Sequence, residues 1–317
     1  MDAEPILQKT PTEDISMKLT KVLMFTAGIL SASALAQSKD YSGAELYTRD
    51  TQMYGKYEAR MYMAAGSGIV SSMFLYHNDS YLGGDEPWVE VDIEILGKAP
   101  ASFQSNIITG TADSKKTSEK HHALSPAANK GYHTYGMEWT PTYVSWIIDG
   151  VTVRKTMTDS NDTKGQVAAL IREQGLRFNL WSSESEGWVG AFDESILPVH
   201  QYIDWVKVYS YTPGAGENGS GFTLAWTDDF NEFDDSRWAT GDWTFDGNRV
   251  TMSPDNVSIA DGHLVLSLTK AGSEGFQGTV PTDAIRKNNG GIRAGVSRPE
   301  YLSTFDLMGR YKGLAKK

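Results

Sequence analysis

The stretch Trp88-Val89-Glu90-Val91-Asp92-Ile93-Glu94-Ile95 decides both the fold and the chemistry of this chain of 317 residues. Apolar residues alternate with acids in it, which is the two-residue period of a β-strand. Successive side chains of a strand point to opposite faces, so Glu90, Asp92 and Glu94 share one face and the aliphatic residues share the other. The run contains no Lys or Arg. It indicates either a solvated outer face, where acids are common, or a catalytic surface.

The chemistry of paired carboxylates favours the catalytic interpretation. Cleavage of a glycosidic bond uses one carboxylate as nucleophile or base and one carboxylic acid as proton donor. Two carboxylates about 5.5 Å apart repel by roughly 3 kcal/mol, or about 2 pKa units, at an effective dielectric of about 20. One of the outer pair should therefore keep a proton near neutral pH, with Asp92 between them able to hydrogen-bond to either. Since positions i and i+4 of a flat strand lie roughly 13 Å apart, strand curvature has to bring Glu90 and Glu94 together.

The composition limits the classes of protein to which this chain can belong. The net charge of -11 and the pI of about 5.0 argue against nucleic acid or an anionic membrane as partner. A neutral substrate fits better. The chain has no Cys, so no disulfide framework exists. Its 9 Trp, 15 Tyr and 11 Phe can pack the core of a β-sandwich, and their flat faces can also stack on sugar rings.

The N-terminal region is typical of an export signal. A short basic region, Met17 to Lys21, precedes the mostly apolar run Val22 to Leu35, and Ala34-Leu35-Ala36 forms an A-x-A cleavage signature. The apolar run is short for a membrane span. We expect an extension over residues 1–16, a signal peptide over residues 17–36 and a secreted mature protein from Gln37. A buried apolar N-terminal segment is the alternative.

The pattern from Tyr41 to Tyr211 predicts an all-β fold, a sandwich or jelly roll of two antiparallel sheets. Short segments rich in aromatic and β-branched residues predict strands over residues 57–63, 70–76, 88–96, 102–108, 132–139, 143–148, 151–156, 176–181 and 202–211. Asp149-Gly150 is a hairpin signal between two of them. A helical turn or two is expected around Val167–Glu173. His121-His122 are expected on an exposed loop, and His133 in the core.

Residues 212–221 form a linker by composition, and the strand-like segment 222–271 follows it. About fifty residues bury too little surface for an assured domain. The simplest interpretation is that this segment supplies strands to the first sheets, so that residues 37–271 form one catalytic jelly roll. A small separate module is the alternative. Residues 272–317 are expected to be a tail, either disordered or a sorting signal that begins near Phe305-Asp306.

Several motifs together resemble family 16 of the glycoside hydrolases. They are Trp88 to Glu94, Phe103-Gln104-Ser105-Asn106, His133-Thr134-Tyr135-Gly136, Phe178-Asn179-Leu180-Trp181 and Asp204-Trp205-Val206. The order of the parts resembles a circularly permuted 1,3-1,4-β-glucanase (lichenase), because the segment from Thr227 to Leu264 precedes the catalytic strand in ordinary members. The spacing Glu-x-Asp-x-Glu looks like the lichenase type, since laminarinase-like relatives carry one more residue there as a bulge.

The resemblance implies a retaining mechanism through a glycosyl-enzyme intermediate in a cleft. It assigns Glu90 as nucleophile, Glu94 as general acid/base and Asp92 as the carboxylate that assists the nucleophile. It also implies substrate contacts by Phe74, Tyr76, Asn78, Gln104, Asn106, Glu119, Arg177, Asn179, Trp181, Trp243 and Arg249. Lys115 departs from an amide at the corresponding place. A structural calcium is implied at Asp204, Asp229 and the backbone of Gly262. No cofactor is expected for catalysis.

The function expected from these observations is a secreted, monomeric endo-hydrolase of mixed-linkage β-glucan such as lichenan or barley glucan. A transglycosylase acting on β-glucan or xyloglucan is one alternative. A non-catalytic glycan-binding jelly roll is another, although the complete acid triad argues against it.

Overall fold

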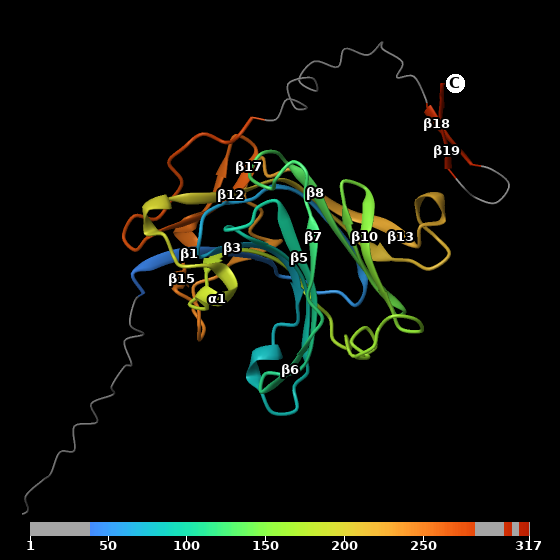
Figure 1. Ribbon diagram of the computed structural model, residues 1–317, viewed down its shortest axis with the longest axis horizontal. Coiled ribbons are helices and arrows are strands. Elements are labelled where there is room, and N and C mark those ends of the chain that lie inside the picture. The colour runs from blue at the N-terminus through green and yellow to red at the C-terminus, as the bar shows by residue number, and fades with distance from the viewer. Residues whose placement is uncertain (1–38, 283–300, 306–310, 317) are drawn as a thin grey trace, which may run out of the picture. The chain divides into compact units, whose positions relative to one another are not determined.

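The computed structural model describes residues 39–282, 301–305 and 311–316, and the fold is an all-β jelly-roll sandwich (Figure 1). Each strand predicted between residues 57 and 211 forms, with its ends shifted by three residues at most. The strands up to the linker are β1 (Tyr41–Thr48), β2 (Gly55–Tyr62), β3 (Ile69–Tyr76), β4 (Trp88–Leu96), β5 (Ser102–Thr111), β6 (Ser114–Thr117), β7 (Lys120–Ala123), β8 (His133–Trp139), β9 (Tyr143–Ile148), β10 (Val151–Met157), β11 (Gly175–Ser182) and β12 (Val199–Tyr211). Those after it are β13 (Phe222–Asp228), β14 (Trp238–Thr240), β15 (Val250–Met252), β16 (Val257–Ala260) and β17 (His263–Lys270).

Two layers of strands make up the sandwich. Sheet I runs β14-β1-β11-β3-β4-β5, and β6 and β7 both pair with β5. Sheet II runs β10-β9-β8-β2-β12, and both β13 and β17 pair with β12 on its far side. The first residues of β1 pair with β17 and β15, so β1 connects the two layers.

The core lies between the sheets and fixes the register of β4. Val89, Val91, Ile93 and Ile95 are all fully buried there. Each buried aliphatic side chain contributes about 1.5–3 kcal/mol, and a slip by one residue would turn all four toward solvent. The alternation of the sequence therefore places the three acids on the outer face of sheet I.

The segment after the linker completes both layers. β13 and β17 pair with β12, and β14, β15 and β17 pair with β1. The segment is thus built into the sandwich and forms no separate module. Its last strand ends beside the first residues of the body, where the Ala271 amide donates to the Asp40 carbonyl over 2.9 Å.

Two local predictions are wrong. No helix forms over residues 167–173, because the Asp162 carboxylate accepts from the Gln166 and Val167 amides and holds this stretch in turns. His121 and His122 lie in strand β7 rather than in a loop. The short helices η1 (Ser80–Leu82), α1 (Glu186–Val189), η2 (Glu194–Ile196), η3 (Glu217–Gly219) and η4 (Pro254–Asn256) were not predicted. His133 is buried, as expected, and contacts the Asp149 carboxylate over 2.6 Å.

The tail prediction needs correction over its first residues. Residues 272–282 pack on the body, because Phe276 contacts His200 and Tyr202 and Val280 is buried beside Val265. The boundary at residue 271 was therefore placed too early. Farther on, β18 (Tyr301–Phe305) and β19 (Tyr311–Lys316) pair antiparallel with each other. The predicted signal peptide lies outside the described residues, and within those residues no helix is long and apolar enough to cross a membrane.

Candidate active site

Sheet I aligns the predicted site residues in rows that cross its strands. Directly opposite residues of paired strands have Cβ atoms about 4.5–5.5 Å apart and share a face. The row through the last acid contains Glu45, Asn179, Ser72, Glu94, Gln104 and His121. The next row contains Tyr47, Arg177, Phe74, Asp92 and Asn106, and the third contains Tyr76, Glu90 and Ile108. Residues distant in sequence thus form one surface around the acids.

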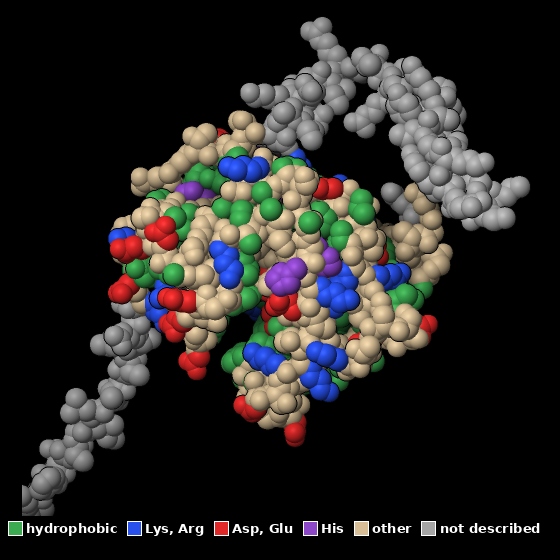
Figure 2. Space-filling view, in the orientation of Figure 1, with side chains coloured by type: hydrophobic (Ala, Val, Ile, Leu, Met, Phe, Trp, Pro, Cys, Tyr) green, Lys and Arg blue, Asp and Glu red, His purple; other side chains and the backbone are tan. Residues whose placement is uncertain are grey.

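The surface beside these rows is hollowed. Figure 2 shows a hollow next to the lobe that carries η1 and β6, with acidic and His side chains at its edge. A pocket of about 280 Å³ lies beside the end of β4, lined among others by Leu96, Gln104, His121 and Trp188. A second, smaller cavity of about 60 Å³ lies between Thr48 and Trp226, away from the acids.

Glu90 is the outer acid that receives hydrogen bonds and faces positive charge. The Trp88 indole donates to Glu90 Oε2 over 2.5 Å. Burial is the largest effect and raises the pKa of Glu90, while hydrogen bonds from Trp88 and Asp92 and the positive charges of Lys115 and Arg177 oppose that rise. The positive charge that the sequence run itself lacks therefore comes from two other strands of the sheet.

Asp92 is a buried acid whose surroundings favour the protonated form. Its side chain is 3% exposed, and burial, together with the charges of Glu90 and Glu94, raises its pKa well above the usual range. The protonated carboxyl donates to Glu90, because the hydrogen bond between them raises the pKa of Asp92 and lowers that of Glu90. The backbone of Asp92 is fixed as well, since the Trp146 indole donates to its carbonyl over 2.9 Å.

Glu94 keeps its proton into the weakly alkaline range. Burial raises its pKa to about 8, with further contributions from the charges of Glu90 and Glu119. No hydrogen bond that lowers the pKa of Glu94 opposes these effects, in contrast to Glu90. The environments of the two outer acids therefore differ, because lowering contacts oppose the effect of burial at Glu90 only, and the arrangement favours the proton on Glu94 and the charge on Glu90.

Arg177 anchors the other side of the surface. Its guanidinium is paired with the buried Glu45 carboxylate and donates to Asn78 Oδ1 over 2.7 Å. It also lies over the rings of Tyr47, Tyr76 and Trp243 at 4.7, 5.1 and 5.8 Å. An arginine that is 8% exposed and paired in this way through both terminal nitrogens holds the aromatic wall in place.

The remaining predicted contacts surround these groups, some in the same rows and some beyond the ends of the strands. Trp181 packs against Trp188 and Phe245, with ring centroids 5.8 and 5.3 Å apart, and Asn179 Oδ1 accepts from Ser72. Trp243 packs on Tyr47, whereas the Arg249 guanidinium lies 5.2 Å from the Phe192 ring. Asn106 is buried and accepts from the Ser118 amide over 2.9 Å, so its carbonyl oxygen is already engaged.

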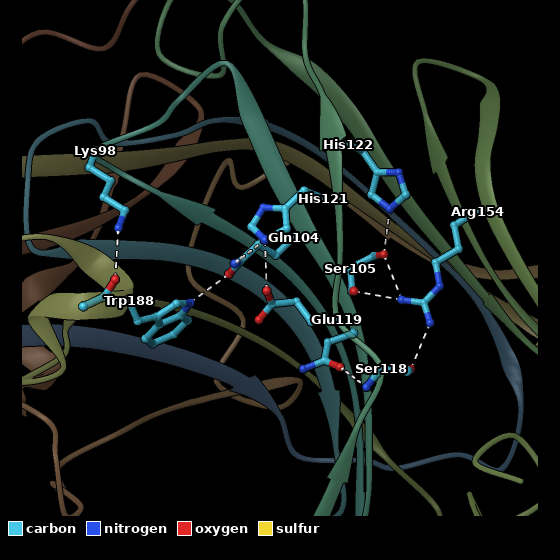
Figure 3. A network of polar contacts seen from close by, with 11 residues as sticks. Lys98, Gln104, Ser105, Ser118, Glu119, His121, His122, Arg154 and Trp188 are labelled. Carbon is cyan, nitrogen blue, oxygen red and sulfur yellow. Dashed lines mark hydrogen bonds and ion pairs between the residues drawn. The ribbon is translucent and has the colours of Figure 1, made fainter. Parts of the chain in front are cut away.

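A network behind the surface supports β5 and the β6–β7 wall (Figure 3). Arg154 of β10 is buried and stacks on Trp146 at 4.3 Å. Its guanidinium donates to the Ser105 carbonyl over 2.8 Å and to Ser118 Oγ over 2.9 Å. Ser105 in turn contacts the His122 ring over 2.8 Å. Sheet II thereby fixes the strand that carries Gln104.

The predicted calcium ligands converge by register. Asp204 lies on β12 between two paired stretches. The β12 residues before it pair with β17 near the start of that strand, and those after it pair with β13 near its end. Gly262 and Asp229 adjoin these two strand ends. The Asp204 carboxylate also contacts Arg60 over 3.0 Å, and no group of three acidic or His side chains suited to a metal occurs in the described residues. A calcium ion here would need backbone oxygens in addition to the two carboxylates.

The fold and the two outer acids, which share one strand face in different environments, define the class of protein, a glycoside hydrolase. Residues 7–207 match the family described as glycosyl hydrolases family 16, and the chain belongs to this family. A β-glucanase of Fibrobacter succinogenes is 60% identical over 272 residues, which are 85% of this chain and 76% of that protein. A β-glucanase of Brevibacillus brevis is 33% identical, and the match covers 57% of this chain and 64% of that protein, less than two thirds of its length. The solved structure of a Bacillus licheniformis β-glucanase is 28% identical, covers 53% of this chain and 77% of that one, and has a TM-score of 0.43.

Sequence reasoning missed several residues of this site. Glu45 and Trp188 contact predicted site residues, and Trp146 and Arg154 support them from sheet II. Lys115 was noted only as a departure from an amide, and its effect on the charge of Glu90 was not predicted. Lys115 lies with its ammonium 3.3 Å from the centre of the Trp88 ring. No local pattern marks these residues, because each acts through a partner on another strand.

Proposed function

We propose that this glycoside hydrolase is a secreted endo-1,3-1,4-β-glucanase that cleaves mixed-linkage β-glucan with retention of configuration. The observation that carries the proposal is the row geometry of β4, in which Glu90, with its hydrogen-bond donors and nearby cations, and Glu94, with a pKa raised to about 8, flank the buried Asp92. The β-glucanase relatives support the substrate class. The uninterrupted spacing Glu-x-Asp-x-Glu supports the mixed-linkage preference.

The mechanism follows from these protonation states. Glu90 attacks the anomeric carbon and forms a glycosyl-enzyme ester, while Glu94 gives its proton to the departing glycosidic oxygen. Glu94, now a carboxylate, takes a proton from water, which attacks the same carbon and releases Glu90. Asp92 stays neutral and orients Glu90 through its hydrogen bond. The wall around Arg177, Tyr76 and Trp243 holds the sugar units bonded to Glu90.

Replacement of the acids tests the proposal. Glu90→Gln should lower turnover of barley glucan at least a thousandfold and leave the melting temperature close to that of the wild type, because the amide cannot attack. Azide should restore turnover of Glu94→Ala on an activated glycoside, since a small anion can attack the glycosyl-enzyme without a base. The exposed Glu184→Gln serves as control. Near-normal activity of Glu90→Gln would refute the nucleophile assignment.

Stereochemistry and substrate choice test the rest. Proton NMR of the first product should show the retained anomer, and inversion would mean that the two carboxyl groups stand too far apart for an ester intermediate. Barley glucan should be hydrolysed faster than laminarin, xyloglucan and carboxymethylcellulose. Chain transfer to added oligosaccharides in place of hydrolysis would identify a transglycosylase, and binding without cleavage a glycan-binding module.

Export, a monomeric state and a structural calcium complete the proposal. The basic and apolar pattern of residues 17–36 supports export, and the N-terminus of the secreted protein should lie near Gln37. Sedimentation should give one chain of 34.9 kDa or less, according to how much has been removed. Calcium would be held by Asp204, Asp229 and the backbone of Gly262, where it would tie β12 to the ends of β13 and β17.

A further inference from the structure

The cavity between Thr48 and Trp226 is lined by buried polar groups that lack partners among the described residues. Gln174 contributes a side chain that is 1% exposed, and within the described residues neither its amide oxygen nor its amide nitrogen has a hydrogen-bond partner. Arg237 lines the same cavity, and its Nη1 is likewise buried and unpaired in that part of the chain. Because a buried polar group without a partner is costly, the cavity favours a polar occupant.

The main chain fixes both residues at the wall of the cavity. Gln174, just before β11, exchanges two backbone hydrogen bonds with Gln52, each over 3.1 Å. The Arg237 carbonyl accepts from the Arg49 amide over 2.8 Å, and the Arg237 guanidinium lies 4.2 Å from the centre of the Trp226 ring. The amide and the guanidinium therefore extend from fixed points on opposite sides of the linker in sequence.

Tyr57 supplies a third polar group to the cavity. Its side chain is 2% exposed, and burial raises the pKa of Tyr57 despite an opposing contact with Gln52, so the phenol keeps its hydrogen. The wall thus offers N–H groups from Arg237 and Gln174, a hydroxyl from Tyr57 and an acceptor in Gln174 Oε1. An occupant that satisfies this set has to donate as well as accept, which a hydroxyl group does.

Charge and size restrict the occupant further. The Arg237 guanidinium is paired with Asp234, whose Oδ2 lies 3.3 Å from its Nε, and Asp50 also lines the cavity. An anion would be repelled by the two carboxylates and a cation by the guanidinium, so a neutral occupant is favoured. The volume of about 60 Å³ has room for about four waters at roughly 15 Å³ each. Because pockets for small ligands begin near about 300 Å³, a sugar ring is excluded.

We propose that this cavity binds neutral hydroxyl groups, as ordered water or as a small polyol, and that Gln174, Tyr57 and Arg237 hold them. Gln174 and Tyr57 precede the linker, whereas Arg237 belongs to the segment 222–271 after it. The bound hydroxyl groups therefore connect that segment to the rest of the sandwich. The site does not depend on the proposed activity, since none of the residues that line it lies in the rows through the acids.

Crystallography of the wild-type protein tests the proposal. Crystals grown without glycerol or acetate should show ordered oxygens about 2.7–3.2 Å from the Gln174 amide and from Arg237 Nη1. After a glycerol soak, oxygens that persist identify water as the occupant, and continuous density for glycerol in their place identifies a polyol. Acetate bound to Arg237 after an acetate soak would overturn the neutral class. A cavity without ordered oxygens, or a Gln174 amide paired directly with a protein group, would overturn the site.

Two matched substitutions test the role of the amide. Gln174→Met should remove at least one of the ordered oxygens, because a thioether has no hydrogen to donate and accepts only weakly. Gln201→Met makes the same change at a buried position of β12 that does not line the cavity, and should leave all of them in place. Oxygens that are unchanged in Gln174→Met would contradict the assignment. The wild-type crystals decide the proposal if either variant fails to fold.

Discussion

Asp92 shows how acids on one strand face can take different roles at this site. It is flanked by two acids and shielded from water, so its carboxyl remains neutral and donates to Glu90. The period of the sequence predicted that the three acids share a face, and electrostatic reasoning predicted that one outer acid keeps a proton. Which outer acid does so depends on Trp88, Lys115 and Arg177, whose contacts with Glu90 have no counterpart at Glu94. That information is absent from the local sequence.

The pH dependence of activity should reflect these two environments. The value of kcat/KM should fall as the pH rises through about 8, because Glu94 must be protonated to act as the acid. Lys115→Gln removes a charge that lowers the pKa of Glu90. The acidic limb of the profile should then move to higher pH, by up to about one unit and less at high salt. Lys116→Gln, on the neighbouring exposed position, is the control; an unmoved limb in Lys115→Gln would contradict the assignment.

At the scale of elements, predictability follows the pattern of burial. β4 was predicted to the residue, because its aliphatic side chains alternate and are all buried. β6 and β7 were not predicted, because their side chains are mainly exposed and their sequences show no alternation of apolar and polar residues. Their pairing with β5 is supported from sheet II by Arg154, a contact that the order of residues does not reveal.

Loss of the Arg154 anchor should destabilise the β5–β7 region. Arg154→Met leaves the Ser105 carbonyl and the Ser118 hydroxyl without their donor, and should cost about 2–4 kcal/mol in the free energy of unfolding measured in urea. Hydrogen exchange should accelerate first in β5. The matched control is Arg172→Met, whose partly exposed contact with Glu86 should contribute at most about 1 kcal/mol. Equal losses in the two variants would contradict the anchoring role.

The junction of β12, β13 and β17 should respond to calcium. A ligand at a hundredfold excess over its Kd stabilises by about 2.7 kcal/mol, which corresponds to roughly 5–10 °C in Tm for a domain of this size. Chelation should lower Tm by such an amount and added calcium should restore it. The response should vanish in Asp204→Asn and persist in Asp255→Asn, an exposed acid elsewhere. A Tm indifferent to chelation would exclude the site.

At the scale of the whole molecule, strand pairing is independent of chain order. β17 and β1 are antiparallel neighbours, and residues 271 and 40 are joined by a hydrogen bond. A tight turn could connect them directly, while the linker 212–221 could be left open. Composition predicted the linker and the strands on both sides of it. The partners of those strands could not be predicted, because sheet register depends on contacts between distant segments.

A transposed chain tests this independence. Residues 222–271, a short turn and residues 39–211 should fold into the same sandwich, with KM unchanged and the free energy of unfolding within about 2 kcal/mol of that of residues 39–271 in the original order, since loop closure varies slowly with loop length. Circular dichroism, thermal melting and barley glucan assays would measure it. A chain opened inside β12 is the control and should not fold. Failure of both chains would show that the present connection is required.

The alternation within β4 also limits how this enzyme can diversify. The side chains that pack in the core and the acids that act on the substrate lie on opposite faces of β4. Insertion or deletion of one residue would therefore turn the acids into the core and the aliphatic side chains outward, which would abolish both the folding and the activity. A length change survives in such a strand when a bulge absorbs it. Lineages that alter what the enzyme digests are therefore expected to vary the hairpins and loops around the acids, such as β6–β7, or to change the length of the strand only together with a bulge.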